Sequence, residues 1–227
     1  MDKRGVCADC VLACVMLVSS GALAQDQGFD AGLRAGYGVP FGKATGAGTR
    51  DMNEGITGIV PWWVDVGYRL TPNVFVGAYF QYGIGFVGSG LSDLCDINGV
   101  DCSTRSIRLG GQVHYHFVPE GRADPWLGYG FGYEWWNLGV RDPAEQLSTT
   151  ARGLEFANFQ AGLDFYAAPH YLGPFVSFSL DQFDSVDACS GAPGATCTVL
   201  GDGEVQEKSL HQWLLFGLRG GFTGFAR

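Results

Sequence analysis

Eight segments of the chain alternate between apolar residues and small or polar residues with a period of two. Successive side chains of a strand point to opposite faces, so this period predicts β-strands. Most of the segments approach or exceed the roughly 9–11 residues that a tilted strand needs to cross a bilayer. The predicted strands span 31–39, 60–70, 74–86, 107–117, 127–135, 157–165, 176–181 and 214–222.

Composition agrees with strands and excludes several other classes. The 227 residues include 36 Gly, and 14% are aromatic. Disordered chains are poor in aromatic residues, and interior Gly disfavours a helix-rich fold. The Gly residues have no three-residue period, which excludes collagen. A net charge of −9 disfavours a nucleic-acid partner.

Short and long connections alternate between the predicted strands. The short connections contain turn residues, whereas the long ones are polar. This arrangement places tight turns and both termini at one end of the sheet and long loops at the other. The short connections are 71–73, 119–125 and 167–174, and the long ones are about 40–57, 88–105, 138–152 and 184–208.

The two strand faces distinguish a membrane barrel from a soluble one. A lipocalin-like barrel would place the apolar face around a ligand, whereas a transmembrane barrel places it toward lipid. The second face is mostly Gly with few charges, which suits a narrow lumen better than a solvated surface. We therefore predict an all-β protein, an eight-stranded antiparallel up-and-down transmembrane β-barrel. Aromatic residues expected in its interfacial girdles are Trp62, Tyr68, Phe117, Trp126, Trp135, Phe165 and Phe222.

Charged residues on the small-residue face form the main candidate site. Four are Arg and four are carboxylates, and unpaired charges in a narrow lumen would be costly. Because Arg pairs bidentately with carboxylates, we predict a balanced network that plugs the lumen. Its expected members are Arg34, Asp65, Arg69, Arg108, Glu134, Asp164, Asp181 and Arg219.

Residues 1–24 have the pattern of a secretory signal peptide. Lys3 and Arg4 precede an apolar run at 11–18, and an A-x-A sequence ends at Ala24. A lipoprotein signal at Cys14 is the alternative, although Asp9 interrupts the stretch before it. The predicted domains are thus a signal peptide at 1–24 and a barrel at 25–227.

The predicted mature chain keeps four cysteines, and an even number in an exported protein indicates disulfides. Three pairings are open, of which the local one is favoured because each pair then lies in one polar segment. No C-x₂₋₄-C spacing remains to support a zinc site. The four residues are Cys95, Cys102, Cys189 and Cys197.

With these features the chain resembles the small eight-stranded bacterial outer-membrane proteins, the OmpA/OmpX/OmpW-like β-barrels. The resemblance covers essentially all of 25–227, but it is architectural and has no specific motif. Such proteins usually end on an aromatic residue, whereas Ala226 and Arg227 follow Phe225 here. The resemblance implies a monomer in the outer membrane of a Gram-negative bacterium. Its partners would be membrane lipid and lipopolysaccharide, with a further ligand or partner at the extracellular loops.

The loops and the histidines provide weaker candidate sites. Asn98-Gly99 is a strong hairpin signal, and it would place Cys95 opposite Cys102 and Asp96 opposite Asp101. Two facing carboxylates could bind a divalent cation, but two solvated acids are the simpler interpretation. The loops 88–105 and 184–208 make the outer end acidic.

His114 and His116 face the predicted lumen and lack a third metal ligand, and neither His170 nor His211 is placed to supply one. We therefore predict no metal and no cofactor. Some barrels of the resembling family are lipid-modifying enzymes that use Ser and His. No G-x-S-x-G sequence is present, and no His is predicted near Ser177 or Ser179.

The predicted function is that of a non-enzymatic barrel with a structural or surface-interaction role. Three alternatives remain: a narrow channel for small or apolar solutes, an outer-membrane lipid-modifying enzyme, and a soluble lipocalin-like binding barrel. An eight-stranded barrel leaves an interior that side chains about fill, so a wide porin is disfavoured.

Overall fold

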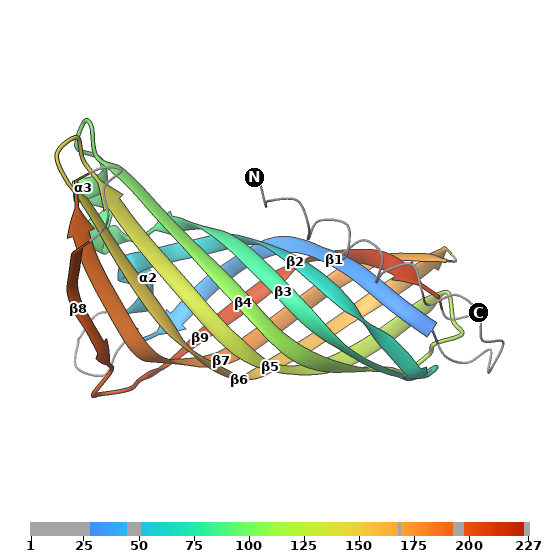
Figure 1. Ribbon diagram of the computed structural model, residues 1–227. Helices are drawn as coiled ribbons and strands as arrows, with labels where there is room; N and C mark the ends of the chain where they lie inside the picture. The colour runs from blue at the N-terminus through green and yellow to red at the C-terminus, as the bar shows by residue number, and fades with distance from the viewer. Residues whose placement is uncertain (1–27, 45–50, 168, 193–197, 225–227) are drawn as a thin grey trace, which may run out of the picture.

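Antiparallel strands close into a barrel in the computed structural model, which describes residues 28–44, 51–167, 169–192 and 198–224 (Figure 1). Two short helices, α2 and α3, lie at the loop end, and neither is long and apolar enough to span a membrane. The elements are β1 Gly28–Gly42, α2 Met52–Gly55, β2 Ile56–Thr71, β3 Val74–Val87, α3 Ser89–Cys95, β4 Asp101–His116, β5 Ala123–Arg141, β6 Gln146–Ala167, β7 His170–Gly191, β8 Thr198–Glu204 and β9 Leu210–Thr223.

Eight strands form the closed barrel, as the alternation predicts. Each strand from β1 to β7 pairs with the next, β7 also pairs with β9, and β9 returns to β1. The ninth strand, β8, pairs with β7 outside the barrel. The sequence did not predict β8, because residues 184–208 have the polar composition of a loop.

The apolar face points outward. Leu33 is 65% exposed, whereas the next residue, Arg34, is 1% exposed; Leu218 and Arg219 show the same contrast at 58% and 3%. An exposed apolar band round a barrel with a polar interior is the pattern of a lipid-embedded barrel. The alternative of a lipocalin-like soluble barrel is therefore wrong.

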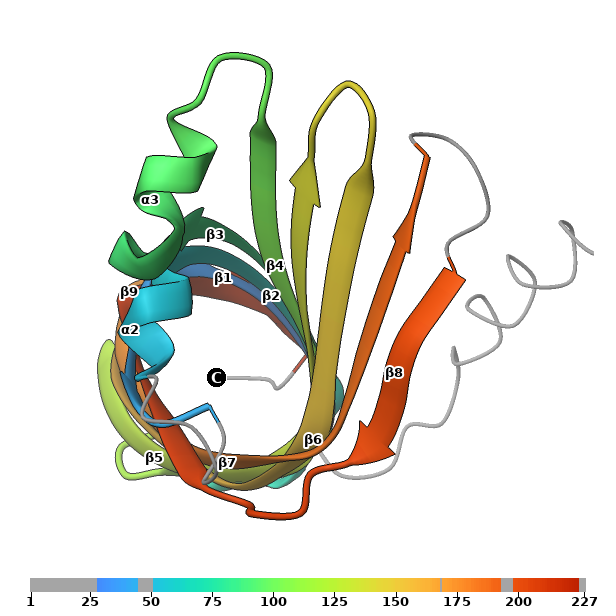
Figure 2. The same cartoon turned by 90° about the vertical axis from the view of Figure 1, so that its left-hand side faces the viewer.

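One side of the barrel continues beyond the rest as an extended wall. The pairing of β3 with β4 ends at Thr104, and that of β7 with β9 ends at Gln182. Pairing of β5 with β6 and of β6 with β7 continues to Gln146. The wall thus consists of the outer parts of β4 to β7 together with β8, and it stands opposite α2 and α3 (Figure 2).

Two predicted long loops are therefore mostly regular structure. Strands β5 and β6 convert 138–152 into a hairpin whose turn closes with a hydrogen bond from Asp142 N to Glu145 O, 2.9 Å. In 88–105, α3 precedes the turn and β4 follows it.

Large apolar side chains close the lumen at the loop end. Met52 from α2 is buried in one cluster with Ile56, Trp136 and Phe183. Together with Trp63, Trp126 and Trp213 deeper in the barrel, these side chains correct the expectation of a lumen lined mainly by small residues. Glycine accommodates them: a Cβ on Gly162 would lie 2.6 Å from the Trp126 ring.

Candidate functional site

The buried charge network begins at the turn end with Arg69. Its Nε donates to Asp30 Oδ2 at 2.9 Å, and its Nη2 donates to the Tyr166 hydroxyl at 2.8 Å. Asp30 also accepts a hydrogen bond from the Tyr171 hydroxyl at 3.1 Å. This first layer ties β2 to β1, β6 and β7 across the lumen.

Arg34 forms the second layer. Its guanidinium makes a bidentate pair with Asp65, with Nε and Nη2 donating at 2.6 and 3.0 Å. Its other donors reach Gln160 at 2.7 Å and Gln112 at 3.2 Å. The carbon Cζ lies 4.5 Å from the centre of the Trp63 ring, which adds a cation–π contact.

Arg219 belongs to the same region and packs on Trp126, with Cζ 4.3 Å from the ring centre. Its Nη2 donates to the Tyr171 hydroxyl at 3.2 Å, and its Nε lies 3.6 Å from Asp164 Oδ1. The indole of Trp126 donates to the same carboxylate at 3.2 Å. Aromatic rings therefore hold two of the cations in place between carboxylates.

Arg108 is the centre of the third layer and faces three carboxylates. Its distances are 3.2 Å to Glu134, 3.1 Å to Glu155 and 3.5 Å to Asp181. The Tyr79 hydroxyl donates to Glu155. All these groups are buried, so carboxylates here outnumber the guanidinium in a region that water does not reach.

The structure places all eight predicted lumen residues inside the barrel, but the predicted charge balance is wrong. Three further carboxylates, Asp30, Asp124 and Glu155, are also buried. Among the described residues the lumen holds four Arg and seven carboxylates. Asp30 and Asp124 lie just before the predicted strands, at strand ends where the alternation is too short to be recognised.

Glu155 was missed for a different reason. A β-bulge shifts the register between Glu155 and Ala157. As a result both Glu155 and Asn158 face inward, although three positions separate them, while Phe156 is exposed. A bulge places two residues opposite one and so breaks the period of two. The alternation in the sequence therefore does not predict that Glu155 faces the lumen.

His114 and His116 face the lumen as predicted, whereas His211 does not lie where it was expected. His114 and His116 are buried in the lumen, and His116 Nδ1 lies 2.8 Å from Asp124. His114 stacks on Trp126 with ring centres 4.7 Å apart. The expectation that His211 is remote is wrong: His211 lies opposite Asp181 in the β7–β9 register, and its Nε2 is 3.0 Å from Glu134.

Trp126 is not a girdle residue, because it is 1% exposed. Its neighbour Leu127 points outward, and adjacent strand residues point to opposite faces, so Trp126 must point inward. Trp126 was expected on the outer face because it lies near the end of a predicted strand, and that expectation is wrong. Trp62, Phe117 and Phe165 lie on the outer face.

Cys95 and Cys102 form a disulfide in the structure. The turn between them includes Gly99 at φ 90° and a hydrogen bond from Val100 N to Ile97 O. The arm before the turn is helical rather than a strand, so Asp96 is the C-cap of α3 instead of pairing with Asp101. Cys189 is disulfide-bonded, and Cys197 lies outside the described residues.

We predict that the double variant Cys95→Ser/Cys102→Ser loosens the tip and leaves the barrel intact. A cross-link across so short a loop contributes about 2–3 kcal/mol by restricting the open state. Limited proteolysis should therefore cut 89–100 faster than in the wild type, while heat-modifiable gel mobility stays unchanged. Equal cleavage rates in the two proteins would contradict the prediction.

Of the two serines considered for catalysis, Ser179 lies within the network, whereas the buried Ser177 hydroxyl has no hydrogen-bond partner among the described residues. Ser179 donates to Asp181 at 2.6 Å and accepts from Arg108 at 2.9 Å. His211 is close to Asp181, contrary to the expectation that no His lies nearby. All five side chains are buried in the lumen.

Comparisons with known proteins agree with this architecture. The family model for the outer membrane protein beta-barrel domain matches residues 10–173. No curated protein matches the chain at a significant level. A major outer membrane protein from Thermus thermophilus is 13% identical, with coverage of 87% of this chain and 98% of that one and a TM-score of 0.58.

Two further solved structures show lower scores. Ail, the attachment invasion locus protein of Yersinia pestis, is 12% identical over 88% of this chain and 99% of its own, with a TM-score of 0.45. The outer membrane protein OprG from Pseudomonas aeruginosa is 11% identical over 88% and 99%, with a TM-score of 0.43. The family match, the closed eight-stranded barrel and its exposed apolar band together show that this chain belongs to the outer membrane protein beta-barrel domain family and lies in the outer membrane.

Proposed function

We propose that this protein is a closed, non-conducting barrel whose role is structural and surface-interacting. The observation that carries the proposal is the filled lumen. All four lumen Arg side chains are buried and contact carboxylates in successive layers along the barrel. A solute or a hydrated ion would have to displace several of these pairs to pass.

The aromatic side chains support the same conclusion. Trp63, Trp126 and Trp213 are fully buried inside the barrel. At the loop end, Trp136 and Phe183 stack with ring centres 6.3 Å apart beside buried Met52. Interiors packed in this way have few voids larger than water, which disfavours the narrow-channel alternative.

The extended wall supports a role at the cell surface. In barrels of this kind the longer connections face the exterior and the tight turns face the periplasm. The wall and α2 border an apolar cavity of about 400 Å³, whose lining includes Leu91, Leu138 and Leu147. An interaction role would use this outer end, because the cavity and the extended wall lie there.

The conductance prediction follows directly from the filled lumen. In planar bilayers the protein should produce no stable openings, because the buried Arg–carboxylate pairs of the three layers lie across the lumen. A porin inserted into the same bilayers provides the positive control. Heat-modifiable gel mobility of protein recovered from the bilayer preparation shows that it was folded. Reproducible single-channel openings by folded protein would overturn the proposal in favour of a channel.

A further inference from the structure

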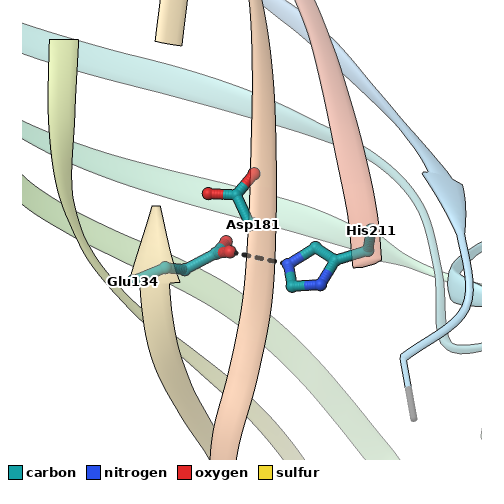
Figure 3. A group of neighbouring side chains, drawn as sticks. All are labelled: Glu134, Asp181 and His211. Atoms are coloured by element: carbon teal, nitrogen blue, oxygen red, sulfur yellow. Dashed lines mark hydrogen bonds and ion pairs between the residues drawn. The ribbon is translucent and has the colours of Figure 1, made fainter. Parts of the chain in front are cut away.

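Three potential metal ligands meet in the lumen from three different strands. Glu134 lies on β5, Asp181 on β7 and His211 on β9 (Figure 3). One carboxylate oxygen from each acid and one imidazole nitrogen all lie within 4.8 Å of one another. Within the described part of the chain, this is the one group of three or more such ligands.

The negative charge around Arg108 exceeds the positive charge by enough to favour a divalent cation. Glu134, Glu155 and Asp181 surround the single guanidinium of Arg108. With these groups ionised, the cluster has two more negative charges than positive ones. Excess charge is costly in a buried region, and an ion with two positive charges would neutralise it.

The hydrogen bonds leave an atom of Asp181 unused. Arg108 Nη2 lies 3.2 Å from Glu134 Oε1 and 3.5 Å from Asp181 Oδ2, so it contacts one oxygen of each acid. The second oxygen of Asp181, Oδ1, is buried and has no hydrogen-bond partner among the described residues. The second oxygen of Glu134 contacts His211 Nε2 at 3.0 Å. A buried acceptor without a donor is unusual in a folded protein, and this one belongs to a carboxylate that has an oxygen within 4.8 Å of both other ligands.

We propose that Glu134, Asp181 and His211 bind a divalent transition-metal ion, with Zn²⁺ as the probe. Imidazole and carboxylate ligands suit zinc, whereas Ca²⁺ and Mg²⁺ prefer oxygen ligands alone. Neighbouring ligand atoms of a tetrahedral zinc ion are about 3.4 Å apart. The contact between Glu134 and His211, 3.0 Å, is already close to this value, and a ligand oxygen of Asp181 lies within 4.8 Å of both.

Packing holds the histidine in position for this role. The His211 ring stacks on Phe183 with ring centres 4.2 Å apart and an interplanar angle of 28°. Arg108 meanwhile fixes one side of each acid. The surrounding structure therefore holds all three ligands. The site goes beyond the proposed surface role because it needs neither a partner nor a pore.

The test measures zinc in protein extracted from outer membranes. The protein is unfolded in a chelator, refolded in detergent with or without Zn²⁺, and desalted before its metal content is determined. Refolding with the ion present avoids dependence on access to the buried site. We expect one tightly held zinc ion per chain. Addition of Co²⁺ instead should give the visible absorption bands of a four- or five-coordinate ion.

Two conservative variants and one matched control locate the ion. His211→Gln and Asp181→Asn should each lower zinc affinity at least about tenfold, while both keep a polar side chain for their neighbours. His116→Gln is the control, because it alters another buried His that contacts a single carboxylate, Asp124. This variant should bind zinc as the wild type does. Heat-modifiable mobility verifies folding in every case.

Several results would contradict the proposed zinc site. Folded wild-type protein that retains no zinc would do so, as would full zinc binding by folded His211→Gln. Displacement of zinc by equimolar Ca²⁺ would assign the binding to the acidic loops instead. Because conductance is measured separately, failure of the zinc site is distinguishable from failure of the non-conducting barrel.

Discussion

Replacing Arg108 with Met is expected to destabilise the barrel by about 3–5 kcal/mol, the cost of removing one partner of a buried ion pair. Arg108 is fully buried and is the cation nearest to Glu134, Glu155 and Asp181. Met fills a comparable volume, so the loss of charge and hydrogen bonds dominates the effect. Without the guanidinium, three carboxylates remain together in a region that excludes water. Urea unfolding of refolded protein in detergent, with chelator present, measures the change.

Arg105→Met provides the matched control for this measurement. Arg105 lies on the same strand, three residues away, and its side chain is exposed. An exposed substitution of this kind usually changes stability by less than about 0.5 kcal/mol. If Arg108→Met unfolds within about 1 kcal/mol of Arg105→Met, the network contributes little to the stability of the barrel.

Most of the barrel could be predicted from the sequence because alternation reports strand faces directly. Arg34 and Arg219 point inward for the same reason that Leu33 and Leu218 point outward. The alternation says nothing about residues beyond a segment, so the wall and β8 escaped prediction. Their polar sequence resembles loops, and only pairing with neighbouring strands makes them regular.

The contacts within the lumen could not be predicted in the same way. Arg34 and its acceptor Gln160 are 126 positions apart, and closure of the barrel brings them together. Glu134, Asp181 and His211 likewise come from strands whose relative register the sequence does not specify. One bulge was enough to hide Glu155. The face to which a side chain points thus follows from the local sequence. Its contact partners in the lumen follow from the register of the strands and the closure of the barrel.

Closure itself depends on a pair of small residues at the seam between the first and last strands. Gly36 on β1 lies opposite Gly217 on β9. A Cβ added at Gly217 would lie 2.1 Å from the Ala35 carbonyl oxygen and 2.6 Å from the Gly36 Cα. Both atoms belong to the backbone, so a rotamer change cannot relieve the clash. The two strands would have to separate where the barrel closes.

Gly217→Val is therefore expected to destabilise the barrel by about 3 kcal/mol or more, the upper range for overpacking a filled site. A loss of stability would be informative, because replacing Gly by Val within a strand normally favours strand structure. Gly203→Val is the control: Gly203 lies on β8, outside the barrel, and a Cβ there meets nothing within 4 Å. The urea midpoint and the fraction with heat-modifiable mobility measure both variants. A Gly217→Val barrel with the wild-type midpoint would show that the seam tolerates separation, and that closure does not depend on the close approach of β1 and β9.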